Sequence, residues 1–311
     1  KRSLHRWLAR TFLKSKYRTY ELNFPIMNIS TKAKIYLASL INRPIVFIFD
    51  SVFGARIRKV KRRGLLWNLD LTEGIDFSIF IFGLFEKETS QAIRRLITNN
   101  SVVIDIGANI GAHTLPMAEL VGEKGKVYAI EPTNYAYSKL KNNLLINGNL
   151  SKRVQADQII LVSNSGGGRV RDLYSSWPLS VKPKDSKRHP VHQGVLRTIS
   201  GAEEMTLDDY VSMNNLTSLD LIKLDVDGNE LEVLRGAKYV LKNIKPTLIM
   251  EFAPEQYDNP NDFLKVVEIL VSEGYRYYSL NEKTQYSIEP HVLIKNIPTN
   301  GSINVVARAL K

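Results

Sequence analysis

Two short segments of the chain place carboxylates directly after an apolar run. The first reads VVIDIGANIGAHT over residues 102–114 and contains Asp105. The second reads IKLDVDGNE over residues 222–230 and contains Asp225 and Asp227. An apolar run followed by a glycine turn and a helical pattern is typical of a buried strand in a parallel α/β sheet. Because ligands bind at the carboxyl ends of such strands, we expect both segments to line one binding site.

The turn in the first segment is suited to a polar ligand. Gly107 and Gly111 allow the backbone to approach a ligand closely, because glycine has no Cβ atom. Asp105 and Asn109 stand where side chains and free backbone amides can bind polar groups. The glycine spacing is G-x-x-x-G, so the pyrophosphate-binding pattern G-x-G-x-x-G of dinucleotide sites is absent. The pattern therefore favours S-adenosylmethionine over a dinucleotide.

A further carboxylate is expected beside that turn. Residues 126–131 predict the next strand, which ends at Glu131. A carboxylate at the end of the strand after a glycine-rich turn is placed to accept hydrogen bonds from ribose hydroxyls. The predicted cofactor-binding residues are Asp105, Gly107, Asn109, Gly111, Glu131 and Asp225.

These residues belong to a longer set of segments by which the chain resembles the FkbM-type methyltransferases, from about residue 65 to residue 280. The matching segments are Asp70–Asp76 with Phe85 and Glu86, Asp105–Thr114, Glu131 with Pro132, Thr206–Asp209, Ile222–Glu230, Val233–Gly236, and Pro246 through Glu251 and Phe252. The resemblance implies a class I methyltransferase fold and methylation of a hydroxyl on a sugar, glycolipid or polyketide. The chain departs from the family at Asp227, where glutamate is more common, and in a long basic segment after the third strand.

Three residues are candidates for the chemistry of methyl transfer. Displacement at a sulfonium needs a nucleophile held in near-attack geometry, and a hydroxyl nucleophile must also lose its proton to a base or a metal. The candidate catalytic residues are Asp225, Glu251 and Lys223, on the fourth and fifth predicted strands. If the fourth strand stays regular, alternation places Lys223, Asp225 and Asp227 on one side of it. For Lys223 the alternative is a buried ion pair that organises the strand ends.

Other polar residues have less specific interpretations. Glu230 begins the helix after the fourth strand, where helix capping is the leading interpretation. His113 is expected to pack beside the cofactor rather than to act as a base. His189 and His192 lack the spacing of a metal site, whereas carboxylates with water suffice for Mg²⁺. Dependence on a divalent metal therefore stays open.

Alternating strands and helices predict a doubly wound, mostly parallel α/β sheet of seven strands, as in class I methyltransferases. The first five strands are expected at 102–106, 126–131, 157–162, 219–226 and 246–252. The segments 275–280 and 303–308 are expected to close the sheet as a hairpin-like pair with one antiparallel strand. Helices are expected at 86–98, 110–121, 134–147, 229–242 and 260–273.

The predicted organisation is a basic N-terminal arm, residues 1–64, followed by a methyltransferase domain, residues 65–311. Residues 163–205 interrupt this domain with glycines, prolines, aromatic residues and basic residues. Long irregular segments in compact domains are usually functional or disordered. We expect a substrate-facing lid whose basic groups meet phosphate or carboxylate on a glycan, with a plain solvated loop as the alternative.

The basic charge is concentrated near the N-terminus. Residues 1–63 hold 16 of the 43 basic residues but only Glu21 and Asp50 among the 31 acidic ones, a local net charge of +14 within a total of +12. Leu4 and Trp7 share one helical face with basic residues around it, a pattern typical of an interfacial helix on an anionic membrane. The alternatives are packing on the enzyme's own body or on a second subunit in a homo-oligomer, and nucleic-acid binding, which the scarcity of aromatic residues disfavours.

The chain has no cysteine, which excludes disulfides, cysteine-bound zinc and thiol nucleophiles and fits a reducing compartment. No signal-peptide pattern and no membrane-spanning run is visible, so we expect a cytoplasmic protein, peripheral at the inner face of a membrane if the arm binds lipid. The predicted function is that of an S-adenosylmethionine-dependent O-methyltransferase acting on a hydroxyl of a saccharide, glycolipid or related natural product. The alternatives are an RNA ribose methyltransferase and a non-catalytic membrane-docking module that keeps the fold.

Overall fold

The computed structural model describes residues 57–165, 173–175, 178–179, 194–257, 259–299 and 301–310, together with Leu40. The predicted interfacial helix near the N-terminus lies outside the described residues, as do His189 and His192 of the insertion. Among the described residues, none of the helices is long and apolar enough to cross a membrane.

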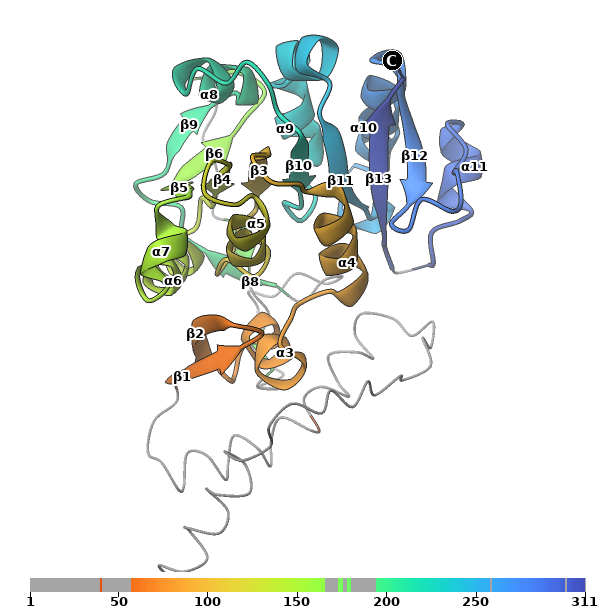
Figure 1. The fold of residues 1–311 in the computed structure, drawn as a ribbon. Helices are drawn as coiled ribbons and strands as arrows, with labels where there is room; N and C mark the ends of the chain where they lie inside the picture. Colours follow the sequence, from red (N-terminus) through yellow and green to blue (C-terminus); the bar gives the residue numbers. More distant parts are fainter. Residues whose placement is uncertain are drawn as a thin grey trace, which may run out of the picture.

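A seven-stranded sheet forms the centre of the fold (Figure 1). Its strands are β3 (Val102–Ile106), β4 (Lys126–Ile130), β5 (Val154–Asp157), β10 (Leu221–Leu224), β11 (Thr247–Phe252), β12 (Tyr275–Ser279) and β13 (Ile303–Ala309). They lie in the order β12-β13-β11-β10-β3-β4-β5. All neighbours are parallel except that β13 is antiparallel to both β11 and β12. The mostly parallel sheet and its antiparallel closing pair are therefore confirmed.

Different helices cover the two faces of this sheet, as a doubly wound fold requires (Figure 1). They are α4 (Lys87–Leu96), α5 (Thr114–Leu120), α6 (Asn134–Leu145), α7 (Gly148–Ser151), α8 (Leu207–Met213), α9 (Glu230–Arg235), α10 (Pro260–Ser272) and α11 (Pro290–Ile294). Val103 and Leu221 share a buried cluster with α4 and α5, whereas Ile104 and Ile222 share one with α8, α9 and α10. Successive strand residues thus point to opposite faces, and burying each of these side chains contributes about 1.5–3 kcal/mol.

A hairpin and a helix precede the sheet in the chain. They are β1 (Ile57–Arg62), β2 (Leu65–Asp70) and α3 (Gly74–Phe82), drawn below the central sheet in Figure 1. The hairpin turns through Arg63 and Gly64, whose φ angles of 47° and 89° suit a two-residue type I′ turn. Trp67 belongs to one buried cluster with Ile110 and Leu115, so the hairpin packs beside the segment that follows β3.

The third strand predicted from the sequence differs from the one observed. Residues 157–162 were expected to form one strand, but β5 ends at Asp157 and β6 (Ile159–Leu161) pairs with β9 (Glu203–Met205) in a separate two-stranded sheet. The chain therefore leaves the central sheet at Gln158, because the two ends of the insertion pair with each other.

Two predicted helices are shorter than expected. The helix expected from residue 110 begins at Thr114, after the turn that follows β3. The helix expected over 229–242 ends at Arg235, and a π-helical segment covers Val240–Ile244. A Cβ atom on Gly236 would stand 2.3 Å from the carbonyl oxygen of Val162. The backbone after β6 lies so close to residue 236 that only glycine fits there. Because glycine is a poor helix former, α9 ends just before it.

The described parts of the insertion pack against the segment after β2. Within the insertion, β7 (Leu173–Ser175) and β8 (Val195–Arg197) pair in antiparallel fashion. Glu73 forms a β-bridge with Pro178. The Oε1 atom of Glu73 also lies 3.4 Å from Nη2 of Arg197. Both contacts attach the insertion to the start of the methyltransferase domain.

Candidate active site

The turn after β3 carries the predicted glycines, and contacts within the chain explain them. Gly107 and Gly111 have φ angles of 76° and 91°, and Asn109 between them has 49°. A Cβ atom on residue 107 would stand 1.8 Å from the carbonyl oxygen of Asp225. At residue 111 it would stand 2.9 Å from the side chain of Leu140. The turn after β3 therefore packs directly on the backbone that follows β10.

Glu131 lies at the end of β4, as predicted, and supports the same turn. Its carboxylate accepts hydrogen bonds from the backbone nitrogens of Asn109 and Thr133, both at 2.9 Å, and from the hydroxyl of Thr133 at 2.5 Å. Burial raises the pKa of Glu131, although these hydrogen bonds act in the opposite direction. A carboxylate offers about four acceptor positions, so one stays available for a ligand hydroxyl.

Lys223 lies in a buried ion-pair network with two of the predicted carboxylates. Its Nζ is 3.1 Å from Oδ2 of Asp225 and 3.7 Å from Oδ1 of Asp105, and its side chain is 4% exposed. The hydroxyl of Thr114 donates to the other oxygen of Asp105 at 2.6 Å. Burial lowers the pKa of Lys223, but the charges of Asp225 and Asp105 outweigh burial and raise it overall. The ammonium therefore ties the end of β3 to the end of β10.

Asp225, Asp227 and Glu251 form a cluster at the ends of β10 and β11. One carboxylate oxygen of each lies within 4.8 Å of those of the other two. β10 ends at Leu224 and Asp227 has a φ of 51°, so a left-handed turn, not strand alternation, places Asp227 here. Burial and the charge of Asp225 raise the pKa of Glu251 to about 8. Burial and the charges of Asp225 and Glu251 raise the pKa of Asp227 well above its ordinary value.

This cluster supports two kinds of chemistry. Carboxylate oxygens are the ligands that Mg²⁺ prefers, so these residues could hold a divalent metal. Without a metal, a carboxyl group whose pKa lies near the working pH serves as a general base. Both kinds of chemistry use the same three residues, Asp225, Asp227 and Glu251.

Glu230 fixes the loop that carries these carboxylates. It accepts hydrogen bonds from the backbone nitrogens of Val226 and Gly228 at 3.2 Å and 3.4 Å. Its second oxygen accepts the hydroxyl of Tyr257 at 2.6 Å. Burial raises the pKa of Glu230, with the hydrogen bond from Tyr257 acting against it. Helix capping was the leading interpretation for Glu230. Its carboxylate instead accepts from backbone nitrogens of the loop before α9.

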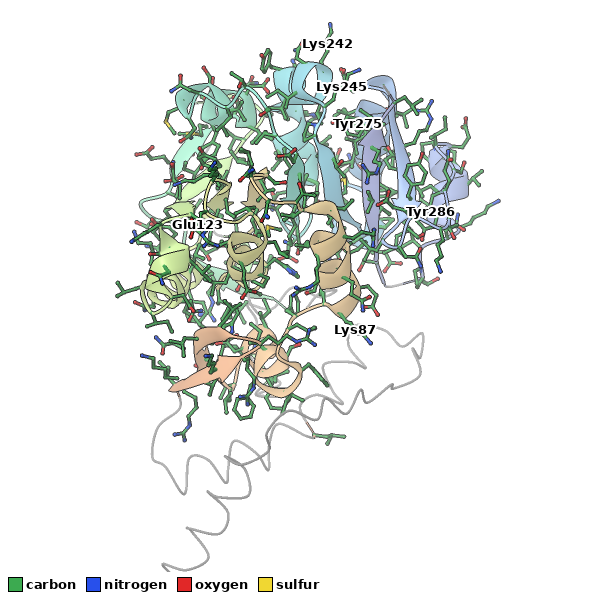
Figure 2. The ribbon with its side chains drawn as sticks, in the orientation of Figure 1. Lys87, Glu123, Lys242, Lys245, Tyr275 and Tyr286 are labelled. Carbon is green, nitrogen blue, oxygen red and sulfur yellow. The ribbon has the colours of Figure 1, made fainter. Side chains whose placement is uncertain are left out.

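Glu86 reaches the site although it was not among the predicted site residues. It lies just before α4, and its Oε2 is 3.8 Å from Nε2 of His113. In Figure 2, Lys87 at the start of α4 and Lys245 just before β11 lie toward opposite ends of the molecule. Burial raises the pKa of Glu86, but contact with His113 and the charge of Lys223 outweigh it and lower the pKa overall, so Glu86 lies close to Lys223 of β10. The only signal for it in the sequence was its place in the family motif.

The insertion reaches the glycine turn. Asn109 Nδ2 donates a hydrogen bond to Oγ of Ser175 in β7 at 3.3 Å. Ser175 is buried, although it comes from a segment far from Asn109 in the sequence. The substrate-facing lid stays a prediction, and residue spacing gave no signal for Ser175.

The groups left at the end of β3 fit S-adenosylmethionine. Within the described part of the chain, Oδ1 of Asp105 and both ring nitrogens of His113 are buried and lack hydrogen-bond partners. Buried polar atoms normally have partners, so these atoms fit a ligand that supplies them. S-adenosylmethionine carries ribose hydroxyls, an ammonium and a carboxylate, which are partners of the kind these buried atoms could accept.

Fold and site together define a class I methyltransferase that uses S-adenosylmethionine. The model of the methyltransferase FkbM domain matches residues 105–277, more than half of the chain. This chain therefore belongs to the FkbM methyltransferase family, and the predicted resemblance is confirmed.

Individual relatives are more distant. The chain is 25% identical over 244 residues to 2-O-methyltransferase NoeI of Sinorhizobium fredii. The aligned segment covers 73% of this chain and 96% of that protein. It is 25% identical over 170 residues to hexuronic acid methyltransferase AglP of Haloferax volcanii. Here the aligned segment covers 53% of this chain and 61% of that protein. The crystal structure of methyltransferase FkbM from Methylobacillus flagellatus aligns with a TM-score of 0.41 and 16% identity, over 75% of this chain and 59% of that one.

Proposed function

We propose that this protein methylates a hydroxyl of a saccharide or glycolipid, with Glu251 as the general base. The observation that supports this best is the place of Glu251, half-buried at the end of β11 and beside Asp225. Burial and the charge of Asp225 raise the pKa of Glu251 to about 8. A base with a pKa near the working pH accepts a proton effectively in the transition state.

Bound S-adenosylmethionine supplies an electrophilic methyl group on a sulfonium. The bond between the methyl carbon and sulfur would break with its electron pair left on the sulfur, which becomes a thioether. The carboxylate of Glu251 would take the proton of the acceptor hydroxyl as its oxygen gains the methyl group. Gln256 Nε2 donates to Oε2 of Glu251 at 3.2 Å and so helps to orient this carboxylate. General-base catalysis of this kind contributes about 10²–10⁴ in rate.

Asp225 orients the acceptor hydroxyl in this proposal, and Lys223 is a positioning residue. The side chain of Asp225 is 30% exposed, so one part of it meets Lys223 and another is open to a ligand. The buried ammonium holds the carboxylate at 3.1 Å and fixes its position. Fixed orientation matters because a correctly placed nucleophile accounts for much of the barrier reduction in a displacement.

A saccharide acceptor is supported by the relatives and by the insertion. One relative is a 2-O-methyltransferase and another a hexuronic acid methyltransferase. The charges of the insertion suit phosphate or carboxylate groups on a glycan. Its basic residues include Arg169, Arg171, Lys182, Lys184, Lys187 and Arg188.

The test is transfer of a labelled methyl group by the full chain to four acceptor classes: neutral saccharides, uronic-acid saccharides, glycolipids and RNA. We expect label on a saccharide or glycolipid, with mass spectrometry locating it on a hydroxyl oxygen. Glycans from cells with and without the gene should differ at the same position. Label on RNA ribose alone would overturn the proposal. Failure to bind S-adenosylmethionine would instead favour a non-catalytic module.

A further inference from the structure

The last turn of α3 exposes two large apolar side chains. Ile81 is 41% exposed and Phe82 55%, whereas Ile75 and Ile79 of the same helix are buried. The helix ends at Phe82, because Gly83 takes a left-handed φ of 74° and donates its backbone N–H to the carbonyl of Ile79. Exposed apolar surface with polar residues around it commonly marks a contact with another protein or with a membrane.

Two arginines of the β1–β2 hairpin lie against this end of α3. Nε of Arg62 donates to the carbonyl oxygen of Phe80 at 2.7 Å, and its guanidinium carbon lies 4.9 Å from the centre of the Phe80 ring. The side chain of Arg63 passes beside Gly83, where a Cβ atom would stand 3.1 Å from its Cγ. The hairpin therefore places positive charge directly beside the exposed apolar residues.

The exposed positions of β1 add further positive charge. Lys59 and Lys61 share one face of the strand with Ile57, which is 64% exposed. Residues 57–63 read IRKVKRR and hold five basic residues and no acidic one. The same mixture of basic and apolar groups thus continues from the end of α3 along β1.

The acidic residues of this region do not cancel that charge. Glu73 and Asp76, before and within α3, are buried, and each lies against a basic side chain. Their charges are therefore balanced inside the fold. Even when Asp70 of β2 and Glu119 beside the hairpin turn are counted, the hairpin keeps a net positive charge.

These observations favour an anionic membrane over a second copy of the chain. Apolar side chains can enter the boundary between headgroups and acyl chains, while lysine and arginine around them contact anionic headgroups. A symmetric contact between two copies would instead bring two positive surfaces together. The hairpin also belongs to the part of the chain, residues 1–63, whose net charge is +14.

The end of α3 is also close to the candidate active site along the chain. Only Gly83 and Leu84 separate Phe82 from Phe85, whose ring lies 5.8 Å from that of His113 between centroids. The hairpin and α3 lie at one end of the molecule, below the central sheet in Figure 1. A membrane in contact with the end of α3 would therefore lie close to the site.

We propose that the end of α3 and the adjoining hairpin dock on the surface of an anionic membrane. Ile81 and Phe82 enter the lipid below the headgroups. Lys59, Lys61 and Arg63 contact the anionic headgroups. Docking brings the site to the surface where the saccharide of a glycolipid lies. That consequence rests on the proposed function, whereas the docking itself does not.

Quenching of tryptophan fluorescence by brominated lipids tests the docking in the full chain. The probe is a vesicle of phosphatidylserine and phosphatidylcholine with bromine on the acyl chains, which quenches only at short range. Phe82→Trp should lose more fluorescence on these vesicles than the wild-type chain, which has three tryptophans of its own. Tyr239→Trp is the matched control, because Tyr239 is 54% exposed and is three residues from Lys242, which lies toward the other end of the molecule in Figure 2. Its added tryptophan should escape quenching.

Sedimentation with vesicles gives an independent measurement. Ile81→Ser combined with Phe82→Ser should weaken binding to anionic vesicles about 10- to 100-fold, because two apolar side chains no longer enter the lipid. Lys61→Gln combined with Arg63→Gln should weaken it roughly 5-fold for each charge removed. Tyr239→Ser combined with Lys242→Gln is the matched control and should bind as the wild type does. All the replaced side chains are exposed, so each variant should keep the wild-type melting temperature.

Three outcomes would overturn the proposal. The first is no binding of the wild-type chain to anionic vesicles. The second is quenching of Phe82→Trp no greater than that of the wild type in vesicle-bound protein, which would assign binding to other residues. The third is unchanged vesicle affinity in the Ile81→Ser and Phe82→Ser variant. Dissociation of a wild-type oligomer in that variant, seen by sedimentation velocity, would then identify a contact between copies. Because the vesicles contain no acceptor, these results are independent of the proposed methylation reaction.

Discussion

The Cα atom of Gly107 lies directly against the carbonyl oxygen of Asp225, where a Cβ atom would come within 1.8 Å of that oxygen. The backbone nitrogens of Gly107 and Ala108 both donate to the carbonyl of Ile130 at 3.0 Å. The turn after β3 is therefore fixed on one side by β4 and on the other by the loop after β10. A change at residue 107 must move the backbone that carries Asp225.

Gly107→Ala should destabilise the whole domain. The new Cβ atom meets a backbone oxygen, and the φ of 76° is unfavourable for alanine. Overpacking alone costs about 1–3 kcal/mol, and the strained φ adds to that cost. Thermal or denaturant unfolding measures the loss. Gly148→Ala is the matched control, because nothing lies within 4 Å of a Cβ atom there. Equal stability of the two variants would contradict the close approach.

Glu131→Ala should weaken S-adenosylmethionine binding by about 1.5–3 kcal/mol, because it removes a charged acceptor and releases the amide of Asn109. Calorimetry on the purified variant checks the affinity, with Glu123→Ala at an exposed position as control. Gly111→Val should weaken binding further, because its side chain would meet Leu140 and deform the turn. Wild-type affinity in both Glu131→Ala and Gly111→Val would exclude the proposed cofactor site.

The rate of methyl transfer should rise with pH and level off above about pH 8. A general base works only when deprotonated, and the pKa of Glu251 is raised to about 8, so activity is lost as the pH falls below that value. Glu251→Gln should lower the rate by about 10²–10⁴ while S-adenosylmethionine still binds. Asp225→Asn should lower the rate and weaken S-adenosylmethionine binding. The exposed neighbour Glu255→Gln should keep the wild-type profile. Full activity in Glu251→Gln on the true acceptor would remove Glu251 from the mechanism.

Chelation separates a base from a metal ligand at the same carboxylates. If Glu251 acts as a base, activity after dialysis against EDTA should equal that of the untreated enzyme. Restoration of a lost activity by Mg²⁺ would make Asp225, Asp227 and Glu251 metal ligands instead. Calorimetric titration with Mg²⁺ alone gives an independent measurement of the same question.

Deletion of residues 1–20 should leave S-adenosylmethionine affinity unchanged and reduce binding to vesicles that contain phosphatidylserine. This segment belongs to the part of the chain with a net charge of +14, and each basic residue near an anionic membrane contributes about 1 kcal/mol. Added salt should weaken vesicle binding by the full chain, and neutral vesicles are the control. Aggregation of the shortened chain, with no vesicle binding by the intact one, would identify the segment as a packing element.

The sequence was most informative where function depends on local pattern. Glu131, Asp225 and Glu251 each follow a run of apolar residues, and parallel strands bring such ends to one edge of a sheet. The strands β3, β4, β10 and β11 follow from the same periodicity, whereas an antiparallel strand in the closing pair was expected by analogy with class I methyltransferases. These features need no knowledge of long-range contacts.

The features that sequence reasoning missed depend on contacts between distant segments. The requirement for glycine at residue 107 comes from a carbonyl more than a hundred residues away. Glu86 reaches the site because the backbone before α4 turns through a positive φ, which no periodicity indicates. The separate pairing of β6 with β9 likewise depends on how the insertion folds back.

The acidic surroundings of Lys223 have a consequence for how the enzyme completes a cycle. Even with Asp227 and Glu251 protonated, the carboxylates of Asp105 and Asp225 face a single ammonium. Loss of the methyl group converts a positively charged sulfonium into an uncharged thioether. An environment with excess negative charge holds the spent donor less tightly than the fresh one, most of all where water is excluded. The electrostatics that prepare the site for reaction therefore also favour exchange of the used cofactor.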